Sequence, residues 1–426
     1  MSVPFWFFVL AVVVIAWQAF LLVMALFAPA IRYQVERFEA PPIDSDKFLQ
    51  TLEALTDAQV NEHSRLTVLT NGEQFYDAEL QAIRGATRSV NLEAYIFQRG
   101  EIAGRFLQAL AERARAGVKV NLVLDAIGSF STSRGYCKEL VKAGGRVEFY
   151  HPFSWRSLAS INNRTHRELL IVDGRCGFIG GAGIADHWLL NKKNHLRWRD
   201  TVVQVEGDIV SNLQATFAEN WLESCGEVIF GEEYFPPVSH AGTSKAMVIN
   251  SAPSAGGSTR ARILFQALAS ASRRSIRITT PYFLPDDSML RELIRAVKRG
   301  VVVEIIVPGK KSDHGLTRSS SRRLYGDLLK TGARIYEYQP AMIHAKVLVV
   351  DDLWSVVGST NCDNRSFGIN DEVNLAGCDP QLANDLSEDF AADVATSKLV
   401  TFAEWERRPF TERLHEALGW ALQRQQ

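Results

Sequence analysis

The first hydrophobic feature of the chain is an uncharged run over residues 4–31. About 20 apolar residues cross the hydrocarbon core of a bilayer, so this run is long enough for one transmembrane helix. Ala28-Pro29-Ala30 is similar to a signal-peptide cleavage site, but no basic segment precedes the run and the run is longer than the apolar part of a signal peptide. We therefore predict an uncleaved anchor. Arg32 and Arg37 follow it, which favours a single-pass protein of the (inner) cell membrane with the rest of the chain in the cytoplasm.

The hydrophobic pattern changes after a segment over residues 32–65, which is expected to form a linker and a short helix. Residues 88–97 and 117–125 have the composition of buried strands, and residues 103–116 between them carry apolar side chains at helical spacing. Strand, helix and strand of these lengths predict an α/β fold with a mostly parallel sheet.

The same order of strands and helices occurs a second time. A strand (275–283), a helix (288–299) and a strand (300–308) follow a Gly/Ser-rich break at residues 251–258. We therefore predict a duplicated α/β unit with pseudo-two-fold, bilobal symmetry. The expected parts are a first half over 66–250, a second half over 251–400 and a C-terminal amphipathic helix within 401–426.

Composition disfavours several classes of function. The formal net charge of the chain is −1, and a nucleic-acid-binding protein would usually have a clear basic excess. The five cysteines are odd in number and widely spaced, which disfavours both a zinc site and a disulfide framework. We expect no metal, no other cofactor and no nucleic-acid partner.

The candidate catalytic residues lie in a polar motif within an apolar run. His344, Lys346 and Asp351 form an H-x-K-x4-D pattern, and Gly358-Ser359-Thr360-Asn361 follows it. Side chains alternate along a strand, so His344 and Lys346 are expected to share one face.

An imperfect copy of the motif lies in the first half. His166 and Asp173 have the same spacing as His344 and Asp351, and Gly180-Gly181-Ala182-Gly183 follows at the same distance. Glu168 occupies the position of Lys346. Strand alternation predicts that Glu168 shares the face of His166.

The duplicated motif resembles the phospholipase D superfamily. The surroundings are similar to its bacterial cardiolipin-synthase-like branch, over about residues 66–425, in these segments: 166–167, 173–175, 180–186, 198–201, 280–283, 343–346 and 358–361. The resemblance implies a bilobal phospholipase-D-like fold and phospholipid substrates. It implies a membrane-anchored phosphatidyltransferase that joins phosphatidylglycerol to a second lipid alcohol, giving cardiolipin or a related phospholipid. A hydrolase that releases phosphatidic acid and a degenerate lipid-binding member are the alternatives.

The residue types suit phosphatidyl transfer. Histidine can attack or donate a proton near neutral pH, and a covalent phosphohistidine lets an alcohol replace water. Lys346, Asn361 and Ser359 can contact the phosphate oxygens. By position we assign His166 as nucleophile and His344 as acid/base, although the sequence also permits the reverse.

Two pairs of carboxylates accompany the histidines. In the family, acids at the positions of Glu372 and Asp200 hydrogen-bond the histidines, so we expect Glu372 to hold His344 and Asp200 to hold His166. Asp351 and Asp173 are also candidate catalytic residues. Their odd spacing from the histidines favours a structural role at the end of a strand.

Glu168 leaves three interpretations open, because a carboxylate repels a phosphodiester. Lys346 and Asn361 supply the phosphate contacts while Glu168 is protonated or paired, or the substrate carries a cation such as ethanolamine near Glu168, or the protein has little activity. A longer loop precedes His166 than His344, and its Trp155 is predicted to contact lipid.

Overall fold

We describe the protein from a computed structural model, which describes residues 5–27, 41–153, 162–189, 197–238, 240–253, 259–410, 412, 413 and 416. Trp155 lies outside these residues, as does most of the expected C-terminal helix. The N-terminal helix is α1 (Phe5–Phe27). In the part of the chain that the structure describes, no helix qualifies as a membrane span.

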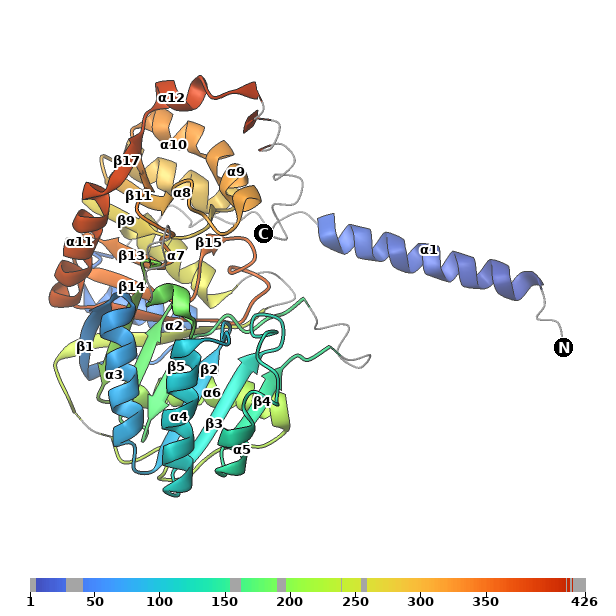
Figure 1. Cartoon of the computed structure of the whole chain (residues 1–426). Coiled ribbons are helices and arrows are strands. Elements are labelled where there is room, and N and C mark those ends of the chain that lie inside the picture. The colour runs from blue at the N-terminus through green and yellow to red at the C-terminus, as the bar shows by residue number, and fades with distance from the viewer. Residues whose placement is uncertain are drawn as a thin grey trace.

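The remaining elements form two groups (Figure 1). The first comprises β1 (Asn61–Thr70), α3 (Asn71–Gly85), β2 (Ser89–Ala94), α4 (Glu101–Arg115), β3 (Lys119–Asp125), α5 (Lys138–Lys142), β4 (Arg146–Tyr150), β5 (Leu169–Val172), β6 (Cys176–Gly180), the 3-10 helix η2 (Asp186–Trp188), β7 (Thr201–Glu206) and α6 (Val210–Cys225). The second comprises α2 (Asp46–Thr56), β8 (Ser244–Ser251), α7 (Arg260–Ala271), β9 (Ser275–Thr279), β10 (Phe283–Leu284), α8 (Asp287–Lys298), β11 (Val302–Pro308), α9 (Gly315–Arg323), α10 (Tyr325–Thr331), β12 (Arg334–Tyr338), β13 (Val347–Val350), β14 (Trp354–Gly358), β15 (Cys362–Asp363), β16 (Glu372–Cys378), α11 (Pro380–Ala395), β17 (Ser397–Val400) and α12 (Phe402–Glu406).

Local sequence explains how these elements begin and which face they bury. Helix α8 starts after Asp286, whose carboxylate accepts the N–H groups of Ser288 and Met289. It then buries Met289, Leu293 and Ala296, which recur at the spacing of one helix face. Strand β2 is buried at every position, as expected for a strand covered on both faces.

One continuous sheet runs through both groups. Its strand order is β17-β12-β11-β9-β13-β14-β16-β8-β1-β7-β6-β5-β2-β3-β4. Read outward from the antiparallel β1–β8 junction, β7-β6-β5-β2-β3-β4 repeats the order of β16-β14-β13-β9-β11-β12. The duplication seen in the sequence is therefore a duplication of topology.

The expected mostly parallel sheet is wrong. Strands β2, β3 and β4 are parallel, as are β9, β11 and β12, but β5, β6, β13 and β14 pair antiparallel with their neighbours. The reason is the short connection in each motif, because a tight turn can join only antiparallel strands. The fold is mixed α/β.

Helices cover both faces of the sheet (Figure 1). Helices α3 and α4 form one hydrophobic core with strands of the first group. Helices α2, α7 and α8 form another hydrophobic core with strands of the second group. A third core contains Phe217 and Trp221 of α6 together with Leu382 and Leu386 of α11. This third core joins the two groups and fixes the edge at which both motifs meet.

Candidate active site

Both motif histidines open into one cleft of about 550 Å³ between the two groups. His166 lies just before β5, and His344 lies just before β13. Both groups also contribute the other side chains around the cleft, which include Tyr95, Ile96, Arg164, Tyr282, Asp313, His314, Leu316, Asn361, Asp363, Arg365, Ser366 and Asn370.

Backbone bridges place each histidine beside the opposite half. Thr165 forms a parallel bridge with Asp371, and the His166 N–H donates to the Asp371 carbonyl at 2.8 Å. In the same way Ile343 bridges Arg199, whose carbonyl accepts from the N–H of His344 at 2.7 Å. The residue after Asp371 is Glu372, and the residue after Arg199 is Asp200. Each histidine therefore lies next to the acid of the other half.

The expected pairing of histidines and acids is wrong. His344 Nδ1 lies 2.9 Å from Asp200 Oδ2, and His166 Nδ1 lies 3.2 Å from Glu372 Oε1. The two acids are exchanged relative to the expectation that Glu372 holds His344 and Asp200 holds His166. The cause is the pair of backbone bridges, which cross between the halves.

The His344 centre is buried and rich in aromatic side chains. His344 is 5% exposed, and its ring centroid lies 5.4 Å from those of Trp188 and Trp198. The Trp188 indole N–H donates to Asp200 Oδ2 at 3.0 Å, which fixes the carboxylate. Burial and the charge of Lys346 lower the pKa of His344, while Asp200 opposes this shift.

Asp200 remains the anion of this centre. Burial disfavours its charge, but the hydrogen bond and charge of His344, together with Lys346, hold the pKa of Asp200 below its usual range. Because Asp200 is ionised, the Nδ1–H of His344 is the donor of their hydrogen bond. In this tautomer the His344 Nε2 carries no proton and can exchange one with a substrate.

Lys346 lies against the His344 ring. Its Nζ is 2.8 Å from His344 Nδ1 and 3.0 Å from Nε2, and it donates to the His344 carbonyl at 2.8 Å. Burial lowers the pKa of Lys346, and nearby carboxylates, Asp200 first, counteract that shift. Gly181 leaves the space for this side chain, because a Cβ there would lie 2.7 Å from Lys346 Cδ.

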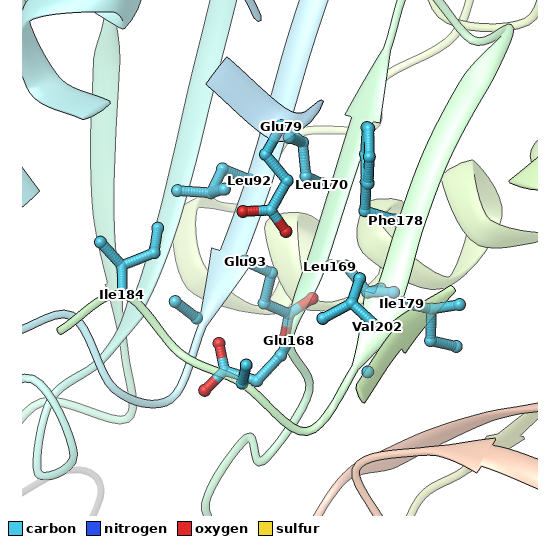
Figure 2. A pocket seen from close by; sticks show the side chains of 13 residues that line it. Glu79, Leu92, Glu93, Glu168, Leu169, Leu170, Phe178, Ile179, Ile184 and Val202 are labelled. Atoms are coloured by element: carbon cyan, nitrogen blue, oxygen red, sulfur yellow. The ribbon is translucent and has the colours of Figure 1, made fainter. Parts of the chain in front are cut away.

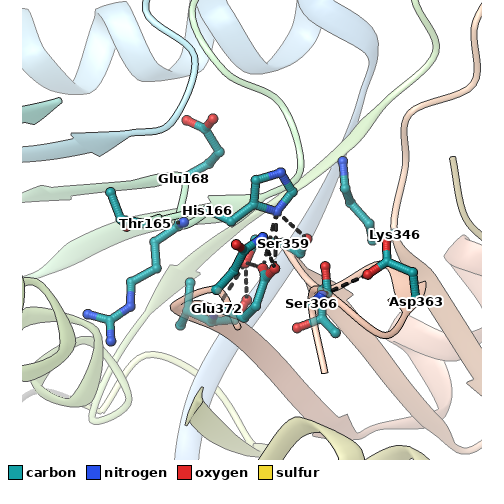
Figure 3. A network of polar contacts seen from close by, with 12 residues as sticks. Thr165, His166, Glu168, Lys346, Ser359, Asp363, Ser366 and Glu372 are labelled. Atoms are coloured by element: carbon teal, nitrogen blue, oxygen red, sulfur yellow. Dashed lines mark hydrogen bonds and ion pairs between the residues drawn. The ribbon is translucent and has the colours of Figure 1, made fainter. Parts of the chain in front are cut away.

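The His166 centre is more open. The His166 side chain is 13% exposed and meets the edge of the Tyr95 ring at a centroid distance of 4.8 Å. Its Nδ1 lies 3.2 Å from the Ser359 carbonyl oxygen, and the Ser359 hydroxyl donates to Glu372 (Figure 3). Ser359 thus orients the acid that holds His166, in addition to any contact with phosphate.

The Glu168 side chain is not directed at the His166 ring. Its Oε1 accepts the Ile96 N–H at 3.1 Å, and the carboxyl group is directed away from the His166 ring (Figure 3).

Glu168 instead lines a second, small pocket. Figure 2 shows its carboxyl group in this pocket with that of Glu79, among apolar side chains. The free volume of about 20 Å³ holds a water molecule but not a lipid head group. Burial raises the pKa of Glu168 well above its ordinary value and that of Glu79 to about 8. Burial therefore favours the neutral form of Glu168.

Asp173 and Asp351 contact the backbone and not the histidines. Asp173 accepts the N–H groups of three successive residues, 87–89, and Asp351 those of residues 273–275. Both adopt positive φ, 54° and 56°, at the turn of their hairpin. They tie that turn to the start of β2 and of β9.

Two further carboxyl or amide groups lie at the cleft. Asn361 is 3% exposed, and its Oδ1 has no hydrogen-bond partner among the described residues. Asp363 is buried, which raises its pKa to about 6. Sequence reasoning missed Asp363 and also Tyr95, Arg164 and Arg365, although Asp363 and Arg365 follow the Gly-Ser-x-Asn segment directly. In the described part of the chain, no group of three or more His, Cys, Asp or Glu side chains is placed to hold a metal ion.

Comparison with known proteins places this geometry in a family. Residues 80–221 and 264–394 match the family described as "Cardiolipin synthase, PLD-like domain". A cardiolipin synthase of Geobacillus kaustophilus (strain HTA426) is 33% identical over 362 residues, which are 84% of this chain and 72% of that protein. The major cardiolipin synthase ClsA of Bacillus subtilis (strain 168) is 33% identical over 368 residues, 86% and 76% of the two chains.

A solved structure supports the fold alone. The crystal structure of phosphatidylserine synthase from Haemophilus influenzae Rd KW20 superposes with a TM-score of 0.67 at 15% identity, covering 88% of this chain and 96% of that one. The family match extends over more than half of the chain, and it agrees with the duplicated topology and the paired histidines. The chain belongs to the cardiolipin synthase family of phospholipase-D-like proteins.

Proposed function

We propose that the chain is a phosphatidyltransferase that forms cardiolipin from phosphatidylglycerol and a second lipid alcohol. The observation that carries the proposal is the single cleft with two histidines, each beside an acid from the opposite half. A nucleophile and a separate acid, both oriented by a third group, are what a two-step displacement at phosphorus needs.

In the first step His166 attacks phosphorus. A P–N bond forms, the P–O bond to glycerol breaks, and His344 gives its proton to the departing glycerol oxygen. In the second step His344 takes the proton of the acceptor lipid's hydroxyl, whose oxygen bonds to phosphorus as the P–N bond breaks. The more exposed ring of His166 suits the attacking role, and Glu372 holds that ring in place.

Lys346 links phosphate binding to the protonation of His344. In the free protein its charge lowers the pKa of His344. A phosphodiester bound beside Lys346 offsets that charge, so His344 gains its proton when substrate arrives. Asn361 supplies a second donor, because its amide group lies at the cleft.

Glu168 is compatible with this activity. Its carboxyl group accepts the Ile96 N–H in a small pocket where burial favours the neutral form, so it is not placed to repel a phosphate or to bind an ethanolamine. This supports the interpretation in which Lys346 and Asn361 carry the phosphate contacts.

Membrane attachment through residues 4–31 is part of the proposal. The described side chains of α1, up to Phe20, are mostly exposed. The sequence after Phe20 contains no charged residue as far as Ile31. Such a segment would hold the cleft near its lipid substrate. Arg32 and Arg37 follow this segment, and positive residues beside a membrane span favour the cytoplasmic side, so we place the rest of the chain in the cytoplasm.

The parts of the chain are proposed as a linker over 32–65, halves over 66–250 and 251–400, and a terminal segment over 401–426. Within the linker, α2 packs Phe48 and Leu52 into the core of the second half, and β1 begins at Asn61.

Lipid profiling tests the function. Cells that express the wild type should accumulate cardiolipin, and cells that express His344→Ala should not. Phosphatidic acid in place of cardiolipin would identify a hydrolase. An unchanged lipid profile with folded protein in the membrane would identify a non-catalytic member.

A further inference from the structure

Large apolar side chains lie exposed at one edge of the first-half sheet. Strands β2, β3 and β4 are parallel, so their carboxyl ends share this edge. After β3, Ile127 is 50% and Phe130 is 83% exposed, and after β4, Phe153 is 77% exposed. Isolated apolar residues are common on protein surfaces, but three on one edge indicate a contact surface.

This edge is also the mouth of the cleft. The Ser129 hydroxyl donates to the carbonyl of Tyr95, a residue of the cleft wall, at 2.8 Å. On the neighbouring loop, Arg164 of the cleft donates to the His151 carbonyl at 3.0 Å. The exposed apolar residues therefore belong to loops that are hydrogen-bonded directly to residues of the cleft wall.

The second half contributes a basic counterpart at the opposite wall. Residues 309–317 follow β11, the strand that corresponds to β3 in the repeated order. Lys310 and Lys311 are exposed there. Leu316, which is 44% exposed, lines the cleft itself.

We propose that these loops form a rim that rests on a phospholipid bilayer and passes a lipid head group into the cleft. The rim consists of residues 126–132, Phe153 and residues 309–317. The proposal rests on the proposed function, because the bilayer contains the substrate of that reaction.

The chemistry of the rim favours an anionic bilayer. Aromatic side chains partition into the interfacial region of a membrane, and exposed lysines are attracted by anionic lipid phosphates. The apolar residues of one wall would therefore contact the interfacial region of the membrane, while the lysines of the other wall contact the lipid phosphates. The rim also explains how a diacyl lipid reaches histidines set in a cleft, since its acyl chains remain in the membrane.

The chain contains a matched control surface. Phe230 is 78% exposed, close to the value for Phe130. It lies near residues 232 and 233, and the Glu233 carbonyl accepts from Ser89 at the start of β2. The control is therefore at the edge of the sheet opposite the rim.

Kinetics on two forms of one substrate separate docking from chemistry. The full chain, reconstituted in vesicles of phosphatidylglycerol and phosphatidylethanolamine, is compared as wild type, Ile127→Ser/Phe130→Ser and Phe230→Ser. A short-chain phosphatidylglycerol below its micelle concentration is the monomeric substrate. We expect the double variant to lose about tenfold or more in rate on vesicle lipid, because two apolar contacts with the membrane are removed. On the monomeric substrate all three proteins should agree within about twofold.

Three kinetic results would overturn the rim: no loss of rate on vesicles, an equal loss on both substrates, or the same loss in Phe230→Ser.

A second measurement does not need turnover. Tryptophan is introduced as Phe130→Trp or as Phe230→Trp, and the added fluorescence is measured in vesicles with brominated acyl chains. Quenching at position 130 alone supports the rim, even if no cardiolipin forms and the proposed function fails. Equal quenching at the two positions, or no quenching at position 130, excludes the rim.

Discussion

The two histidine centres derive from one repeated unit but have become chemically different. The His344 centre contains Lys346 and is enclosed by Trp188 and Trp198. At the position that corresponds to Lys346 the His166 centre has Glu168, which accepts the Ile96 N–H, and its histidine is more exposed. We propose from this comparison that phosphate recognition is concentrated in one half, whereas orientation of the histidines is shared across both.

The largest expected effect follows from removing the cation of the His344 centre. Lys346→Met should lower kcat/KM for cardiolipin formation by about 10²- to 10³-fold, because a preorganised charged donor to the phosphate is lost. Steady-state assays on the reconstituted protein measure this loss. The control is Lys398→Met, since Lys398 is exposed and pairs only with Glu404 in the described structure. A loss below tenfold would place phosphate recognition elsewhere.

The next effect concerns stability and compares the two hairpin aspartates. Asp351→Asn should reduce the free energy of unfolding by about 1–3 kcal/mol, because a buried carboxylate that accepts three N–H groups is replaced. Asp173→Asn should cost less, since Asp173 is only half-buried. Denaturant or thermal unfolding of the full chain in detergent measures both. Equal stability with lost activity would instead give these residues a catalytic role.

The smallest effect is expected at Glu168. Burial favours the neutral form of Glu168, and Glu168→Gln introduces a neutral amide of the same shape whose oxygen can still accept the Ile96 N–H. Cardiolipin formation should therefore stay within about threefold of the wild type, equivalent to less than about 1 kcal/mol. Rates of purified, reconstituted protein provide the measurement. A loss of more than tenfold would show that the carboxyl group takes part in the reaction.

Local pattern was sufficient for part of this site. The repeated motif identified His166, His344 and Lys346, because each motif spans only a few residues and both motifs have the same spacing. The duplicated order of strands was also readable from the sequence, since each repeat carries its own apolar runs and turns.

The partners of the histidines could not be read in this way. The bridges from Thr165 to Asp371 and from Ile343 to Arg199 join residues that lie far apart in the chain, so no local pattern encodes them. The contact of Glu168 with Ile96 was missed because it joins residues 72 positions apart in the chain. Parallel pairing was overestimated because the two motif hairpins were not recognised as hairpins.

The crossed pairing is the central claim, and the pH dependence of kcat/KM tests it most directly. The basic limb reports the loss of the proton that His344 needs as an acid, and Asp200 supports that proton. Asp200→Asn should therefore move the basic limb to lower pH, whereas Glu372→Gln should lower the rate and leave that limb in place. A basic limb that moves in Glu372→Gln and stays fixed in Asp200→Asn would contradict the account.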